Sequence, residues 1–152
     1  MNRIVDRSQS GGPGDIGGKG DLAGKSLQGQ DLRDWDLSGA DLSYASLKQA
    51  NLEGVDLTAA NLYGANLAGA NFKKAILRNA KLEQIKAKEA VLIGADLSGA
   101  NMRWANLSGA DLRGANLTDT NLSKANLLDA RLQGAITVGT DLTGAVLQCA
   151  AD

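Results

Sequence analysis

The side chains most often used in catalysis are scarce in this chain, and their scarcity limits the chemistry it could perform. The sequence contains no histidine and a single cysteine, Cys149. A Ser-His-Asp or Cys-His arrangement therefore cannot form, and no cysteine–histidine spacing offers a zinc site. Carboxylates recur as evenly spaced surface residues, without a cleft that would raise a pKa. We expect no enzyme activity, no cofactor and no metal.

The acidic and amide residues occupy one position of a five-residue period. From Leu22 to Leu147 the period has 26 centres, of which 22 are leucine. The residue before the centre is Asp or Asn in 17 of the 26 repeats. Calcium-binding β-rolls use glycine-aspartate nonapeptides, which are absent here. We expect these Asp and Asn side chains to hydrogen-bond the nearby backbone at turns.

The period of five predicts short extended pieces separated by turns. It matches neither the 3.6-residue period of a helix nor the alternation of a long strand. The small residue two before each centre, usually alanine, shares a face with the leucine when the segment is extended. Glycine, commonest two residues after the centre, supplies the positive φ that tight turns need. Ala87 interrupts the leucines, and Ile85 compensates for the lost volume in the same repeat.

The consensus A-(D/N)-L-x-G, as in ADLSGANMRWANLSGADLRGANL at 95–117, resembles the pentapeptide-repeat family. The resemblance implies an all-β fold, a right-handed quadrilateral β-helix with four repeats per coil and about six and a half coils. It predicts a β-helix domain over 21–152 and a Gly-rich N-terminal tail over 1–20. Hexapeptide helices and leucine-rich repeats fit worse, because their periods differ.

The composition limits the classes of binding partner and the cellular compartments that we expect for this chain. The formal net charge is -1, which gives no general attraction to nucleic acid or to an anionic membrane. No apolar stretch approaches the roughly 20 residues that span a bilayer, and the N-terminus lacks the apolar core of a secretory signal. The lone Cys149 fits a reducing compartment. We expect a cytoplasmic protein.

The two ends of the solenoid differ in sequence. In the first coil Lys25, Gln30 and Trp35 take the small inward positions, and we expect Trp35 to fold over the N-terminal end of the core. Near the C-terminus, outward positions that are normally polar become apolar. These end-contact residues are Leu128, Ile136, Val138 and Val146. An uncapped apolar edge favours end-to-end pairing with a second copy, and the resemblance also implies a C-terminal dimer; a merely frayed terminus is the alternative.

Two groups of outward residues depart from the repeat. The first is the aromatic face, because positions 20 apart should stack. Its members are Tyr44, Tyr63, Glu83, Arg103 and Trp104. Exposed Tyr, Trp and Arg are enriched at interface hot spots. The second is the basic belt, a ring around the rod that Glu83 and Glu89 partly offset. It comprises Lys73, Lys74, Arg78, Lys81, Lys86 and Lys88. The alternative for the aromatic face is chance clustering of its residues. The alternative for the basic belt is a solvated surface that binds no partner.

Three functions remain open at the level of sequence. The first is a non-catalytic protein-interaction module, with an unknown protein partner bound along one face or end. The second is DNA mimicry directed at DNA gyrase, an activity of some members of the family. The near-neutral charge and the basic belt argue against it, because duplex DNA carries one negative charge per ~1.7 Å. The third is a structural element assembled end to end.

Overall fold

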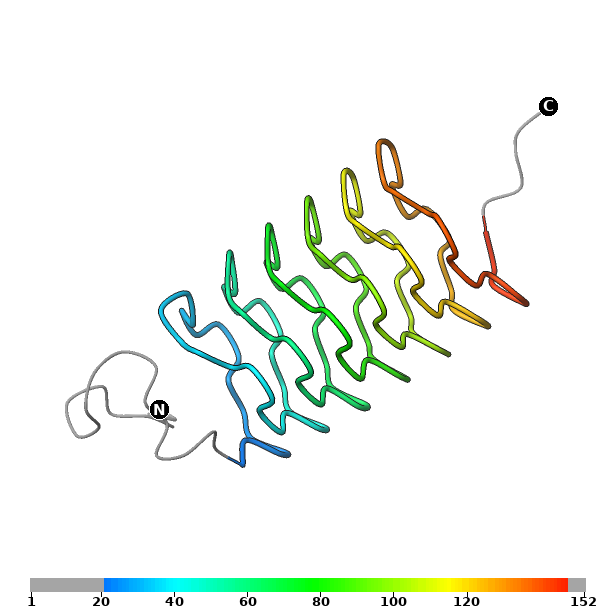
Figure 1. The fold of residues 1–152 in the computed structure, drawn as a ribbon. Helices are drawn as coiled ribbons and strands as arrows, with labels where there is room; N and C mark the ends of the chain where they lie inside the picture. Colours follow the sequence, from blue (N-terminus) through cyan, green and yellow to red (C-terminus); the bar gives the residue numbers. More distant parts are fainter. Residues whose placement is uncertain (1–20, 148–152) are drawn as a thin grey trace, which may run out of the picture.

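The backbone of the computed structural model winds into a stack of coils, with residues 21 and 147 at opposite ends of the stack (Figure 1). The structure describes residues 21–147; the predicted tail over 1–20 and Cys149 lie outside them. Parallel bridges join residues that are 20 apart, from Asp21–Asp41 to Asn126–Val146. Four five-residue repeats therefore complete one coil, as the sequence predicts.

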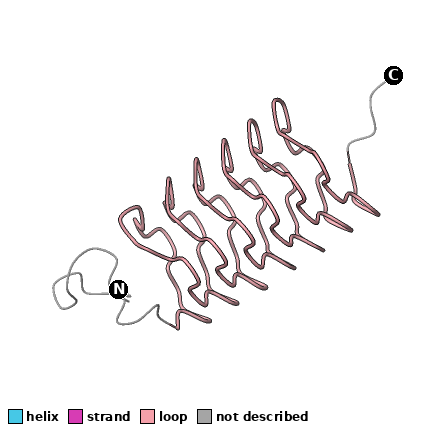
Figure 2. Cartoon of the chain, in the orientation of Figure 1, coloured by secondary structure: helices cyan, strands magenta, loops and turns pink. Residues whose placement is uncertain are grey.

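Each contact between coils is a single bridging residue, so the described residues contain no helix and no longer strand (Figure 2). Hydrogen bonds flank each bridge in a fixed pattern. The Leu42 N–H donates to the Asn61 carbonyl at 2.7 Å, and the Asn61 N–H donates to the Ala40 carbonyl at 2.9 Å. The parallel β-coil is thereby confirmed, while its handedness and the total of about six and a half coils stay predictions.

A tight turn follows every bridge. In a typical repeat the Ala65 N–H donates to the Leu62 carbonyl at 2.9 Å, and the residue just before Ala65 is Gly64 with φ 65°. This left-handed position belongs to type II turns and favours glycine. Of the described residues with positive φ, 13 are glycines and 11 are other residue types, among them Tyr44 and Trp104. Glycine is thus common at the turn, but the fold tolerates larger side chains there.

The interior consists of the period-five leucines and the small residues two before them. Nearly all are below 3% exposed between Leu27 and Leu127. Ile85 and Ala87 are both buried, in agreement with the expected exchange of volume. Thr120 also points inward, where its hydroxyl donates to the Leu97 carbonyl at 2.8 Å. That bond avoids the penalty of an unpaired buried hydroxyl.

The Asp and Asn residues bind the backbone as expected. The Ser43 N–H donates to Asp41 Oδ1 at 3.0 Å, and the Tyr63 N–H donates to Asn61 Oδ1 at 3.1 Å. The same bond, from the backbone two residues later, recurs along the rod. These side chains therefore satisfy a backbone donor that the bonds between coils leave unused. We call this interaction the Asx cap.

The first coil departs from the expectation for the inward positions. Trp35 is buried at 9% exposure and belongs to the core, in agreement with its predicted place at the N-terminal end. Lys25 and Gln30 keep the register of the inward positions, as their N–H bonds to Leu22 and Leu27 show, but both residues are exposed. The reason is energetic, since burying an unpaired ammonium or amide group costs more than the packing returns.

The two ends of the described coil differ in how well their inner leucines are covered. Leu22 and Leu27 in the first coil are 5% and 1% exposed. In the last coil Leu132 and Leu142 are only partly buried, and Leu147 is 44% exposed. The C-terminal end of the described coil therefore presents apolar interior surface.

Candidate functional site

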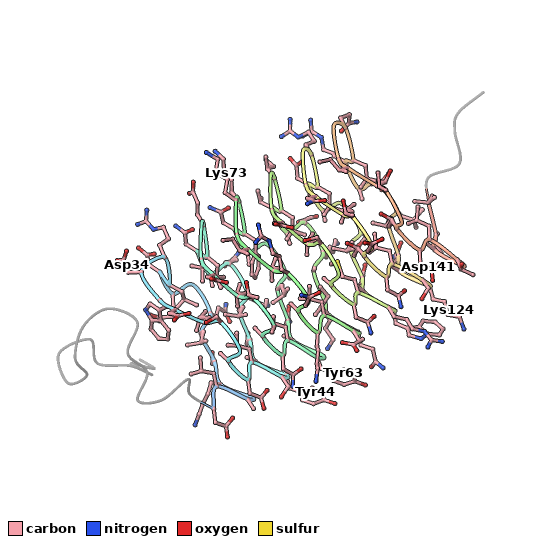
Figure 3. All side chains as sticks on the ribbon, in the orientation of Figure 1. Asp34, Tyr44, Tyr63, Lys73, Lys124 and Asp141 are labelled. Carbon is pink, nitrogen blue, oxygen red and sulfur yellow. The ribbon has the colours of Figure 1, made fainter. Side chains whose placement is uncertain are left out.

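Residues one coil apart form columns on each face, and the first part of the aromatic face is a packed pair of tyrosines. Tyr44 and Tyr63 meet edge to face, with ring centroids 5.6 Å apart and an interplanar angle of 74°. Gly64 makes room for this pair: a Cβ there would lie 2.7 Å from Tyr44 Cε1. Tyr44 is 66% exposed although its ring is held on two sides. The two tyrosines lie together at one edge of the rod (Figure 3).

The second part of the aromatic face is Trp104 with a residue that sequence reasoning missed. The Lys124 Nζ lies 4.8 Å from the centroid of the Trp104 ring, a cation–π arrangement. Trp104 remains 53% exposed. Lys124 occupies the turn position one coil after Trp104, so the 20-residue spacing was a signal that could have found it. Figure 3 shows Lys124 farther toward the C-terminus, along the same edge as the tyrosines.

Glu83 lies in the coil between these two pairs, and Arg103 lies beside Trp104 in the next coil. Glu83 Oε1 accepts a hydrogen bond from Asn101 Nδ2 at 2.8 Å, and its Oε2 is buried without a partner among the described residues. Tyr44 and Trp104 are three coils apart, roughly 14 Å at the usual strand spacing. The structure therefore places all five predicted residues on one face. It divides the aromatics into two pairs, with Glu83 in the coil between them and Arg103 next to Trp104.

The basic belt surrounds the rod, as predicted. All six of its side chains are exposed, and they are distributed over the four faces of one coil. Lys73 lies at the edge of the rod opposite the tyrosines (Figure 3). Arg78 Nε donates to Asp96 Oδ2 at 2.6 Å. Within residues 21–147 the other five belt residues form no ion pair.

The Asx caps stop at the belt. The four consecutive capping positions are occupied by Ile76, Lys81, Lys86 and Val91. None of these side chains can accept a hydrogen bond from the backbone. The backbone N–H groups that these residues leave uncapped become apparent only from the hydrogen bonds of the folded coil.

The predicted end-contact residues lie on two opposite faces near the C-terminal end. Leu128 and Val146 share one face and are 42% and 49% exposed. Ile136 and Val138 share the opposite face and are 50% and 69% exposed. The end of the rod is thus flanked by apolar side chains on two sides. The partly covered inner leucines add to this apolar surface, although sequence reasoning assigned them to the core.

The carboxylates of this surface are tuned by hydrogen bonds from their own turns. Arg113 Nη2 donates to Asp111 Oδ2 at 2.7 Å, and the side-chain hydrogen bonds from Arg113 lower the pKa of Asp111. Partial burial raises the pKa of Asp96, but hydrogen bonds from Ser98 and Arg78 outweigh it, so this pKa also ends below its usual value. Both groups are anions at neutral pH, not candidate acids.

The described residues show neither a candidate metal site nor a candidate membrane span. Over residues 21–147 no group of three or more His, Cys, Asp or Glu side chains could hold a metal ion. The same residues contain no helix long and apolar enough to cross a membrane.

A sequence profile described as pentapeptide repeats matches the chain in 8 copies, over residues 21–58, 36–73, 50–86, 75–114, 88–123 and 125–150. The chain belongs to the pentapeptide-repeat family. The matched segments cover the same residues that form the coil, so family and geometry agree. No curated protein sequence matches the chain.

Three solved members of the family illustrate the likeness. Rfr23 from the cyanobacterium Cyanothece 51142 is 28% identical, with a TM-score of 0.51, over 82% of this chain and 89% of that one. A pentapeptide repeat protein from the Arabidopsis thaliana thylakoid lumen is 32% identical, with a TM-score of 0.44, over 70% and 74% of the two chains. The plasmid-mediated fluoroquinolone resistance protein QnrB1 is 20% identical, with a TM-score of 0.57, over 80% and 74%.

Proposed function

We propose that this chain is a non-catalytic protein-interaction module that binds a protein partner through its aromatic face. The observation that supports this most strongly is the exposure of Tyr44 and Trp104, at 66% and 53%, on one face of a rigid coil. Such large rings normally bury apolar area in a protein–protein interface. Absence of catalysis is part of the proposal, since the chain has no histidine.

The arrangement of the face suits a binding surface. Each exposed ring has a second side chain against it, Tyr63 for Tyr44 and Lys124 for Trp104. Because the rings are restricted before binding, less side-chain conformational entropy is lost when a partner binds. Glu83 lies between the pairs and Arg103 lies beside Trp104, and both can set the orientation of the partner by charge. We therefore expect the partner to contact about four coils along one side of the rod.

The test is capture of the partner with a matched set of variants. Immobilised wild-type chain should retain a protein from an extract of the native organism, and Tyr63→Ala with Trp104→Ala should release it. The control is Ile93→Ala, which removes a large side chain from the same register position as Tyr63 but on the opposite face. Equal retention by wild type and double mutant would remove the aromatic face from consideration.

A second candidate is a homodimer, or a longer assembly, formed through the C-terminal end. It is favoured by the partly exposed inner leucines of the last described coil, above all Leu147 at 44%. The flanking end-contact residues extend that apolar surface. If this end binds a second copy, sedimentation should show a concentration-dependent dimer that Val146→Lys abolishes. A monomer at all concentrations would exclude it.

DNA mimicry receives less support from the distribution of charge. Residues 21–72 hold seven acidic and three basic residues, but the coil at 73–92 holds six basic and two acidic ones. A reversal of sign at mid-rod does not match the uniform charge of a duplex. The likeness to QnrB1, at 20% identity, concerns the fold alone. We expect no inhibition of supercoiling by purified gyrase, and inhibition at micromolar protein would restore this alternative.

The cytoplasmic location stays a prediction, because one solved relative comes from the thylakoid lumen. Fractionation of cells that produce the full chain would check it. Recovery in a lumenal or periplasmic fraction would contradict the prediction.

A further inference from the structure

One coil of the rod lacks, in four consecutive repeats, the Asx cap that most other repeats supply. Wherever Asp or Asn precedes the centre, its side chain caps the N–H two residues later, as Asp41 does for Ser43. In the belt coil, the corresponding N–H group of each of four consecutive repeats finds no acceptor within residues 21–147. They belong to Arg78, Glu83, Lys88 and Ile93. Because each repeat lies on a different face, every face of this coil holds one uncapped donor.

The uncapped donors coincide with the basic belt. Lys81 and Lys86 themselves replace the capping Asp or Asn, so two of the corners combine a free N–H with an exposed ammonium group. A donor left without any partner is costly when a surface becomes covered. A cation and an N–H group at one corner together make a site for an anionic oxygen.

From these observations we infer that the basic belt binds a carboxylate-rich segment of a polypeptide. In the repeats that have Asp or Asn before the centre, a carboxylate or amide oxygen occupies the position of the missing cap. A partner's Asp or Glu side chain supplies the same kind of acceptor. The lysines beside it add the attraction of opposite charge.

The shape of the belt favours a flexible acidic segment over a nucleic acid. The cations are spread around four faces, with two on a single face at most, as with Lys73 and Lys74. A duplex lying on one face would meet few of them and would extend over the acidic coils at 21–72. An extended polypeptide can follow the ring from corner to corner.

A second copy of this chain is a poorer occupant. Its acidic residues lie mainly in the first coils, and several of these carboxylates already accept hydrogen bonds from their own turns. Asp21, Asp36 and Asp56 each cap an N–H two residues later. Carboxylates held in this way are less available to an intermolecular partner than those of a free acidic segment.

Two acidic residues of the belt coil oppose the proposed ligand. Glu83 leans toward the next coil, where Asn101 donates to its Oε1 at 2.8 Å. Glu89 is exposed, and its side chain packs over Gly109. Both reduce the net charge of the belt, and we expect Glu89→Gln to strengthen binding of an anion.

The direct test uses fluorescence anisotropy with a labelled short poly-glutamate peptide and the full chain. Wild-type protein should bind at low salt and release the peptide as salt rises, because exposed charges are screened. Lys81→Gln with Lys86→Gln should weaken binding by about tenfold, as expected for the loss of two exposed charge contacts. Failure of the wild type to bind at low salt would overturn the proposal.

A second pair of variants separates the backbone donors from the charge. Ile76→Asn with Val91→Asn leaves the net charge unchanged but supplies two Asx caps, which should occupy the Arg78 and Ile93 donors. Binding should weaken by about threefold, the loss of about one hydrogen bond's net contribution. The control is Ser46→Asn, which adds the same cap at Lys48 outside the belt and should not change binding.

Three other outcomes would count against the inference. Equal affinities for the capped variant and wild type would show that the free donors play no part. Tighter binding of an oligonucleotide of matched charge would identify a nucleic-acid surface instead. Concentration-dependent self-association abolished by Lys81→Gln with Lys86→Gln would identify a second copy as the occupant. None of these readouts depends on the aromatic face, so the two proposals can fail separately.

Discussion

Substitution of Gly64 by alanine tests how the tyrosine pair is built into the coil. Gly64 has φ 65°, and the Cβ of an alanine would lie 2.7 and 2.8 Å from Tyr44 Cε1 and Cδ1. Gly54 has φ 72°, and a Cβ added there would meet nothing within 4 Å, so it is a matched control. Both substitutions place a side chain in the left-handed region, at about 1–2 kcal/mol each.

Only Gly64→Ala also displaces the Tyr44 ring from Tyr63. An edge-to-face pair contributes about 0.5–1.5 kcal/mol beyond its buried area. We therefore expect Gly64→Ala to lower the free energy of unfolding by about 1 kcal/mol more than Gly54→Ala does. For a chain of this length that difference is about 2–4 °C in melting temperature.

The assay is urea unfolding followed by circular dichroism, with Tyr44→Ala as a second background. Once the ring is absent, Gly64→Ala and Gly54→Ala should cost the same free energy. If Gly64→Ala and Gly54→Ala lowered the free energy of unfolding equally in the wild-type background, the reasoning would be refuted. The Tyr44 ring would then move aside without any loss of stability. A persisting difference in the Tyr44→Ala background would assign the effect to something other than the ring.

The remaining predictions concern pH, the core and the C-terminal end. The folded-state pKa values of Asp41, Asp96, Asp111 and Asp141 are lowered, mainly by hydrogen bonds, so their stabilisation is present above about pH 4 and is lost as pH falls through the folded pKa. With no histidine in the chain, melting temperature should vary little between about pH 5 and 8 and fall below about pH 4; a transition near pH 6.5 would contradict this. Phe72 is fully buried where other repeats have leucine, so Phe72→Leu should cost about 1 kcal/mol and Phe72→Ala about 3–5 kcal/mol in urea unfolding; similar costs would show that the site collapses freely. At the C-terminal end, Leu147→Lys should reduce self-association in sedimentation as Val146→Lys does, whereas Leu147→Met should preserve it; retention of the dimer by both lysine variants would exclude that end as the contact.

Most of the fold could be predicted from the sequence because each repeat contains its own pattern of inward and outward residues. The spacing of leucine and alanine determines which side chains face inward, and their burial confirms it. The expected Asx bonds are also present, for example at Asp41 and Asn61. Lys25 and Gln30 occupy the expected register but are exposed, because register alone ignores the cost of burying polar groups.

The candidate surfaces were less predictable because they depend on contacts between coils. The register placed the aromatic residues on one face, but it did not reveal that Tyr44 packs on Gly64 or that Lys124 covers Trp104. The uncapped N–H groups of the belt emerge only when every backbone donor is followed to its acceptor. The exposure of Leu147 likewise follows from the absence of a further described coil, and not from its place in the repeat.

Site-specific photo-crosslinking tests the central claim, binding of a protein partner by the aromatic face, most directly. A photoreactive phenylalanine analogue would replace Tyr44 in the full chain, produced in cells of the source organism, with the same substitution at Glu53, on the opposite face and outside the basic belt, as the control. Irradiation should yield a defined adduct with a second protein from position 44 and none from position 53. An adduct of equal yield from both positions, or an adduct from position 53 alone, would contradict the account.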